Sequence, residues 1–215
     1  MVRTGSVEEI NKAENALIFI PDISGFTGLM NNTRLSESRK IIHDLMEVII
    51  DSVTLNLKIG DIEGDAVLFY HTGPAPSVKD ITCQAQKTFY DFINVLKEKE
   101  KNPNFPPGAR NLTLKFIVHY GEIITTSIKG IIKLMGSDVV LAHRILKNNI
   151  KSREYILLTE QYLETQEEKE LKDAFLFSEL RNGRKKYDHL GYINYKYCTL
   201  TPMRKSLDKK FTTCY

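Results

Sequence analysis

The chain has few cysteines, and they follow no pattern that would staple a fold or hold a metal. Cys83, Cys198 and Cys214 are the three among 215 residues, and none belongs to a Cys-x-x-Cys pair. An odd, scattered set excludes a disulfide framework and a structural zinc site. A chain of this length buries roughly 70% of its unfolded surface, so an ordinary hydrophobic core is sufficient for folding.

Long apolar stretches are also missing. The first residues lack the apolar segment of a secretory signal, and no stretch approaches the ~20 residues of a membrane helix. Basic residues gather only in short groups at 181–186 and 204–210. Aromatic residues interleave with apolar ones at strand spacing, which indicates a core rather than a base-stacking surface. We therefore expect a soluble, cytoplasmic protein that binds neither a membrane nor nucleic acid.

The chain contains no internal repeat, and no Cys-His or Ser-His-Asp nucleophile arrangement can be built from its local sequence. Its apolar patterns instead predict alternating strands and helices. In the first half we expect a strand at 16–21 ended by Pro21, a helix capped by Ser36, a hairpin at 53–60 and 65–71, and a helix at 78–100. A strand at 112–120 follows, and residues 121–122 turn it into a second strand. The last expected elements are a helix capped by Ser137 or Asp138, a strand at 156–158, and a hairpin at 175–200 that turns at 181–184.

This order predicts an α+β sandwich of ferredoxin-like character, with a mostly antiparallel sheet and helices packed on one side. We assign residues 1–200 to a single domain. Residues 201–215 are polar, and we expect them to form a partly loose C-terminal tail.

Two acidic segments lie where apolar strands end or begin. Residues 19–27 (FIPDISGFT) place Asp22 after an apolar strand and before a small-residue turn and a helix start. Residues 61–70 (DIEGDAVLFY) place Asp65 directly before another apolar strand. A carboxylate at the end of a buried strand is costly unless a cation compensates it. With the free N–H groups of the turn beside Asp22, the pair predicts a site for magnesium and a phosphate chain.

Other interpretations of these residues remain open. Asp22 would serve equally as an ordinary helix N-cap, and Glu63, on the same strand face as Asp65, is best interpreted as solvated. For Arg144 a surface salt bridge and a phosphate contact are both compatible with its helix. His119 and His143 fit core or surface histidines better than metal ligands.

In this order the motifs resemble the class III nucleotidyl cyclase catalytic domain, that of adenylate and guanylate cyclases, over about residues 16–200. Besides the two acidic segments, residues 116–122 (FIVHYGE) are similar to the family's strand ending in His-x-Gly. Residues 136–144 (GSDVVLAHR) are similar to its Gly-x-x-Val-Asn-x-Ala-x-Arg helix. More narrowly, residues 20–27, 62–66 and 142–148 resemble a bacterial cyclase-like family of uncharacterised function.

The resemblance implies the nucleotidyl cyclase type of sandwich and particular site residues. Asp22 and Asp65, with the Ile23 carbonyl, would hold two Mg²⁺ or Mn²⁺ ions. Arg144 would neutralise charge on the attacked phosphate. Because cyclases of this class are dimers with sites at the interface, Arg144 would act on metals held by the partner of a homodimer. The backbone N–H groups that would cradle phosphate oxygens belong to Ser24, Gly25, Phe26 and Thr27.

Four positions depart from the family pattern. The ribose-orienting asparagine is Val140, which cannot hydrogen-bond, and the late lysine that contacts the triphosphate is Leu190, beside His189. At the two base-selecting positions the chain has Asp61 and Lys133. These residues either recognise another base or form an ion pair with each other.

Losing one positioned transition-state donor costs about 10²–10³ in rate. We therefore expect a nucleoside triphosphate site that serves binding and signalling more than turnover. The alternatives are an active class III cyclase, which converts a nucleoside triphosphate to a cyclic nucleotide and pyrophosphate with altered base choice, and a structural relic with an interaction role.

Overall fold

The structure is a computed structural model that describes residues 12–206. Its eight-stranded sheet has the order β2-β3-β1-β4-β6-β8-β7, and β5 pairs with β4 outside this path. Every neighbouring pair is antiparallel except β4 with β6. The strands are β1 (Ala13–Ser24), β2 (Lys58–Glu63), β3 (Ala66–Thr72), β4 (Thr113–Ile128), β5 (Ile131–Met135), β6 (Tyr155–Thr159), β7 (Arg181–Tyr187) and β8 (Gly191–Thr199). The predicted α+β class and mostly antiparallel sheet are confirmed.

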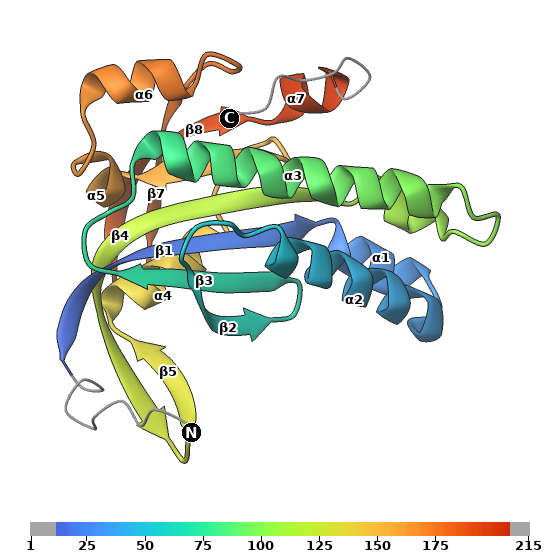
Figure 1. The fold of residues 1–215 in the computed structure, drawn as a ribbon, viewed down its shortest axis with the longest axis horizontal. Coiled ribbons are helices and arrows are strands. Elements are labelled where there is room, and N and C mark those ends of the chain that lie inside the picture. The colour runs from blue at the N-terminus through green and yellow to red at the C-terminus, as the bar shows by residue number, and fades with distance from the viewer. Residues whose placement is uncertain (1–11, 207–215) are drawn as a thin grey trace.

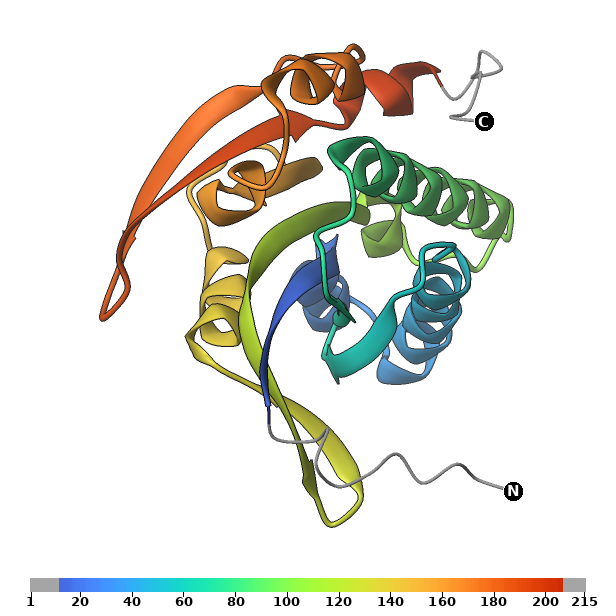
Figure 2. The ribbon, with the colours of Figure 1, turned by 60° about the vertical axis from the view of Figure 1, so that its left-hand side comes forward.

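Helices cover both faces of this sheet. The long helices α2 and α3 lie on one face, while α4 lies on the other (Figures 1 and 2). The expectation of helices on one side only is therefore wrong, because the central strands alternate between two apolar clusters. Among residues 12–206 no helix is both long and apolar enough to span a membrane. The helices are α1 (Phe26–Asn32), α2 (Leu35–Asp51), α3 (Val78–Glu100), α4 (Ser137–Ile145), α5 (Glu160–Leu163), α6 (Glu168–Ala174) and α7 (Thr201–Ser206), with a short 3₁₀ turn at Pro107–Asn111.

The central strands run further than the sequence predicts. Pro21 does not end β1, which pairs continuously with β4 from Ala13 to Ser24. Proline lacks only the N–H donor, and the ladder to β3 is paired at residues 16–19 and again at Asp22. Gly121 likewise does not turn the chain but lies inside β4. Asp22 therefore lies inside β1 and not in a turn after it.

Three predicted turns and caps are displaced. Ser36 lies inside α2, whose N-cap is Arg34, and Gly136 rather than Ser137 or Asp138 precedes α4. Residues 181–184 belong to β7, and the hairpin turns instead at 188–190, where His189 adopts a positive φ of 67°. Residues 181–184 stay extended because β8 pairs with β7 from Arg181 to Tyr187.

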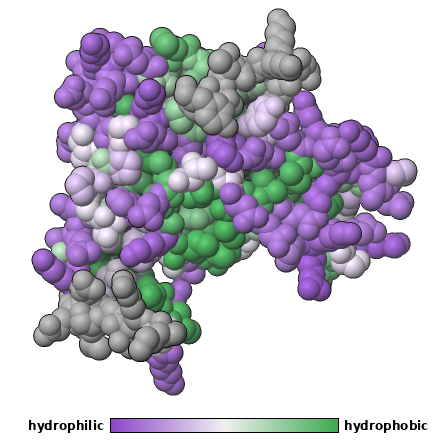
Figure 3. All heavy atoms as spheres, viewed as in Figure 1, coloured by the Kyte–Doolittle hydropathy of each residue, from purple (hydrophilic) through white to green (hydrophobic). Residues whose placement is uncertain are grey.

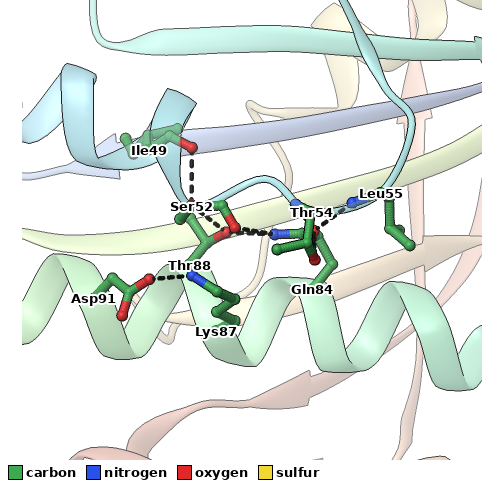
Figure 4. A network of polar contacts seen from close by, with 8 residues as sticks. All are labelled: Ile49, Ser52, Thr54, Leu55, Gln84, Lys87, Thr88 and Asp91. Atoms are coloured by element: carbon green, nitrogen blue, oxygen red, sulfur yellow. Dashed lines mark hydrogen bonds and ion pairs between the residues drawn. The ribbon is translucent and has the colours of Figure 1, made fainter.

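A buried polar network joins α2 to α3 (Figure 4). The Gln84 side chain is 2% exposed, and its Oε1 accepts from the N–H groups of Thr54 (2.7 Å) and Leu55 (3.2 Å). Its Nε2 donates to the Ser52 carbonyl (3.0 Å), and the Ser52 hydroxyl donates to Thr88 Oγ1 (2.8 Å). The network provides hydrogen-bond partners for the backbone groups that follow α2, and so fixes the segment that leads into the β2–β3 hairpin.

The first residues of the predicted tail are ordered as α7. Met203 is buried in the apolar cluster that contains Phe89 and Phe92 of α3. Arg204 Nε donates to Glu154 Oε2 at 2.8 Å. Residues 207–215 lie outside the described part of the chain. The assignment of a partly loose tail therefore remains a prediction for those residues.

Candidate functional site

The two acidic segments meet where β1 ends beside the start of β3. Asp22 lies opposite Ala66 in the β1–β3 ladder, and the Ile23 N–H donates to the Asp65 carbonyl at 3.0 Å. Asp22 alternates in phase with Ile18 and Ile20, so it faces the α4 side of the sheet. The structure thus places Asp22 near the end of β1 and Asp65 in the turn directly before the neighbouring strand β3.

The Asp22 carboxylate is buried and has one positive neighbour. It is 9% exposed, and Lys115 lies directly across from it on β4, with Nζ 3.3 Å from Oδ1. Burial raises the pKa of Asp22 above its ordinary value, although Lys115 acts in the opposite direction. Sequence reasoning missed Lys115, although a single lysine within the apolar residues 114–118 is a signal of a buried acidic partner.

Asp65 is more strongly perturbed. Burial, followed by the negative charge of Asp22, raises the pKa of Asp65 to about 6. Lys115 therefore acts to lower the pKa of both carboxylates, while the negative charge of each carboxylate disfavours the charge of the other. A divalent cation would remove this repulsion, so the pair fits the predicted metal.

The backbone beside the carboxylates supports the same fit. Ile23 N–H bonds to Asp65, and in an antiparallel pair the carbonyl of a residue points to the same side as its N–H. The Ile23 carbonyl is thus directed toward the Asp65 side, as the predicted ligand set requires. Asp22 is not the N-cap of α1, because that position is Gly25, with a positive φ of 98° and no side-chain cap. The N-cap alternative for Asp22 is wrong.

A cleft of about 900 Å³, here called the β1–α4 cleft, brings most predicted residues together. Arg144, in the last turn of α4, lines this cleft in the same chain as the two aspartates. The expected action of Arg144 on metals held by a partner chain stays a prediction. His143 also lines the cleft, with Nδ1 3.5 Å from Glu63 Oε2. The predicted residues that line the cleft are Asp22, Ile23, Ser24, Gly25, Phe26, Thr27, Asp65 and Arg144.

The predicted base-selecting residues do not line the β1–α4 cleft. Lys133 on β5 lies 2.6 Å from Asp61 on β2, and this hydrogen bond lowers the pKa of Asp61. Of the two interpretations offered for this pair, the structure shows mutual pairing. Any contact of either residue with a base remains a prediction.

The other departures from the cyclase pattern also lie apart from the cleft lining. Val140 is 48% exposed on α4, one turn before Arg144, and Leu190 packs against the α4-side cluster. The cleft instead receives basic side chains that the sequence analysis did not single out. Among residues 12–206 these are Lys115, Lys147, Arg153 and Lys185.

A buried hydrogen-bonded chain fixes the N-terminal end of α4. His119 is fully buried; its Nδ1 lies 2.9 Å from Thr159 Oγ1 and its Nε2 lies 3.0 Å from Asp138 Oδ1. Asp138 Oδ2 also accepts from the Glu122 N–H at 2.9 Å. Gly121 leaves the space, because a Cβ there would lie 2.3 Å from Asp138 Cγ. His119 is thus a core histidine, as predicted, and it anchors the helix that carries Arg144.

Comparison with solved structures defines the class of fold. The chain is similar to the adenylyl cyclase CyaB from P. aeruginosa, with a TM-score of 0.67, 13% identity, and 95% of this chain and 99% of that chain covered. It is similar to the guanylate cyclase domain of RhGC from Catenaria anguillulae in complex with GTP, with a TM-score of 0.55, 14% identity, and coverages of 87% and 98%. A bacterial light-regulated adenylyl cyclase gives 0.59 at 15% identity over 86% of this chain, which spans 52% of that protein. The fold is that of class III adenylyl and guanylyl cyclase catalytic domains.

Sequence comparison gives the family. The family described as "Protein of unknown function (DUF2652)" matches residues 42–155, more than half of the chain, and the chain belongs to it. The matched segment contains Asp65, Arg144 and Arg153 but not Asp22 or Lys185. The chain is also 31% identical over 122 residues to the uncharacterized protein Rv2561/Rv2562 of Mycobacterium tuberculosis. That match covers 54% of this chain and about half, 56%, of the mycobacterial protein.

Proposed function

We propose that this chain binds a nucleoside triphosphate together with Mg²⁺ or Mn²⁺ in the β1–α4 cleft, and that it serves binding and signalling more than turnover. One observation carries the proposal: the mutually repelling carboxylates of Asp22 and Asp65 share a cleft with Arg144. Carboxylates that need a cation, facing a guanidinium that needs an anion, are complementary to a metal-bound phosphate chain.

Different residues of the cleft would bind the metal and the phosphate chain. Asp22 and Asp65 would hold the metal, which when bound supplies positive charge to phosphate oxygens. The turn from Ser24 to Thr27 borders the same cleft and would present N–H groups to phosphate. Arg144 has a planar fork of donors that matches phosphate geometry.

Turnover is the less favoured function because Val140, four residues before Arg144, replaces the ribose-orienting asparagine of the cyclase pattern. Val140 projects an apolar, half-exposed side chain one helical turn away, where it cannot orient a ribose hydroxyl. An active cyclase with altered base choice remains the second candidate. It is favoured by the placement of Arg144 in the same cleft as both aspartates.

The predicted homodimer has a candidate contact surface. The β4–β5 ribbon projects from the body (Figures 1 and 2), and Figure 3 shows apolar side chains on it above a hydrophilic tip. Ile128, Ile131, Ile132 and Met135 are each more than half exposed. Grouped exposed apolar side chains are typical of protein contacts. Light scattering after size exclusion would show a dimer that Ile131→Asp dissociates; a monomeric wild type would contradict this.

A single assay separates the functions. The purified protein is incubated with Mg²⁺ or Mn²⁺ and each of ATP, GTP, CTP and UTP, and both binding and cyclic product are measured. Binding without product supports the proposal, whereas product that Asp65→Ala abolishes establishes the cyclase. Asp173→Ala, an exposed change on α6, is the matched control. If neither metal nor nucleotide binds, both functions are wrong and an interaction role is left.

A further inference from the structure

The lysine and arginine side chains that line the β1–α4 cleft outnumber its carboxylates. Five basic and three acidic side chains line it, the acidic ones being Asp22, Glu63 and Asp65. Within the described residues 12–206, Lys115 is the only one of these five basic side chains that is paired with a carboxylate. For the other four, residues 12–206 provide no carboxylate oxygen within 4.0 Å. These four are Arg144, Lys147, Arg153 and Lys185.

The unpaired cations come from separate elements and surround the acidic end of β1. Arg144 and Lys147 belong to α4 and the residues after it, and Lys185 belongs to β7, where its ammonium donates to the Lys147 carbonyl. Arg153 donates to the Asn111 carbonyl at 2.8 Å and lies against Gly25, in the turn after Asp22. Such convergence is expected of a site for a ligand with several negative charges.

The uncharged hydrogen-bonding side chains of the cleft are by contrast already engaged within the protein. The Asn148 amide donates to the Ile145 carbonyl (2.9 Å) and to the Tyr155 hydroxyl (2.6 Å). The Ser152 hydroxyl donates to the Glu154 carbonyl at 3.0 Å. These groups offer little to the edge of a nucleobase.

Other polar side chains that line the cleft are also engaged within the protein: His143 Nδ1 lies 3.5 Å from Glu63 Oε2, and the Tyr187 hydroxyl donates to the Lys147 carbonyl at 3.5 Å. Asp61 and Lys133 bind each other away from the cleft lining. Ser24 ends β1 and Thr27 lies in the first turn of α1; both line the cleft together with the aspartates and are therefore placed for phosphate. A site discriminates strongly among polar ligands only when its own polar groups are left unpaired by the wrong one.

We propose that the β1–α4 cleft recognises the phosphate chain of its ligand and not the base, so that its ligand class is metal-bound linear polyphosphate, with or without an attached nucleoside. This inference rests on the proposed phosphate and metal site. We therefore expect the cleft to select its ligands by the number of linked phosphates and not by the base. Phe26 and Ile150, which also line the cleft, accept any base by apolar contact.

Titration calorimetry of the full chain with Mg²⁺ tests the inference, with inorganic tripolyphosphate, pyrophosphate, orthophosphate and the four nucleoside triphosphates as probes. We expect tripolyphosphate and all four nucleotides to agree within about threefold in Kd, and orthophosphate to bind at least about 100-fold more weakly. One nucleotide binding more than tenfold tighter than the others and than tripolyphosphate would overturn the inference but leave the proposed function intact. Absence of binding by every probe would overturn both.

Variants of two of the unpaired cations give an independent readout. Lys185→Ala and Arg153→Ala are each expected to weaken tripolyphosphate and all nucleotides by the same factor, about tenfold. Lys186→Ala is the matched control, because its side chain is exposed on the opposite face of β7 and lies 5.8 Å from the Tyr192 ring centroid. A variant that changes the ratio between nucleotides and tripolyphosphate would show base recognition and contradict the inference.

Discussion

Replacing Asp65 by asparagine is expected to stabilise the metal-free protein while it removes the response to magnesium. The raised pKa of Asp65, about 6 against an ordinary 3.8, means that its ionised form is destabilising in the folded chain. Stability from the neutral carboxyl is fully present below pH 3.8 and is lost as pH rises through 6. At neutral pH the native protein therefore carries a free-energy cost that asparagine, with the same shape and no charge, does not.

The size of this effect follows from the shift. A change from 3.8 to about 6 corresponds to an upper limit of about 3 kcal/mol. Because Asp65 is partly accessible to water, we expect about 1–2 kcal/mol. For a chain of this size that is a rise in Tm of roughly 2–8 °C.

Thermal unfolding at pH 7.5 and pH 5, with and without magnesium, measures both parts of this prediction. At pH 5 the wild-type carboxyl is mostly protonated, so the difference between the two proteins is expected to shrink. Magnesium at 100 times its Kd would stabilise the wild type by about 2.7 kcal/mol and Asp65→Asn by almost nothing. Glu63→Gln removes a charge from the same hairpin at a 64% exposed side chain and is the control. A variant that is less stable than the wild type at pH 7.5, or that keeps its magnesium response, would refute the reasoning.

Three further predictions concern the framework of the site. Gly121→Ala places a Cβ 2.3 Å from Asp138 Cγ and is expected to destabilise the fold by about 1–3 kcal/mol in urea unfolding; an unchanged midpoint would contradict the close approach. Hydrogen bonding to His119 lowers the pKa of Asp138, so its contribution is present above the ordinary pKa of 3.8 and is lost as pH falls through the lowered value. Asp138→Asn is accordingly expected to flatten the acid limb of the stability curve, and an unchanged limb would show that other carboxylates dominate. Gln84→Leu leaves two backbone N–H groups unsatisfied and is expected to cost about 2–4 kcal/mol of unfolding free energy by calorimetry, whereas a neutral result would show that water replaces the amide.

Much of the fold was predictable because its signals are local. Apolar alternation identified the central strands, and α3 was predicted with both of its ends, since its period and its cap at Ser77 are written in consecutive residues. Two of the failures occurred where the pairing of neighbouring strands determines the conformation of a residue. Pro21 stays within β1 because β4 pairs with it on the other side, and residues 181–184 stay within β7 because β8 pairs with them. No single segment contains that information.

Local sequence was sufficient to predict Asp22, Asp65 and the turn beside Asp22 as candidate site residues, because a strand, a carboxylate and a small-residue turn occur in consecutive positions. It also determined the class of fold through the order of its motifs. Three relations become visible in the folded chain alone: Lys115 faces Asp22, Asp61 pairs with Lys133, and the cations of α4, Arg153 and β7 converge on one cleft. Those relations depend on which strands become neighbours, and the electrostatic state of Asp65 depends on burial and on the charge of Asp22, which no local pattern encodes.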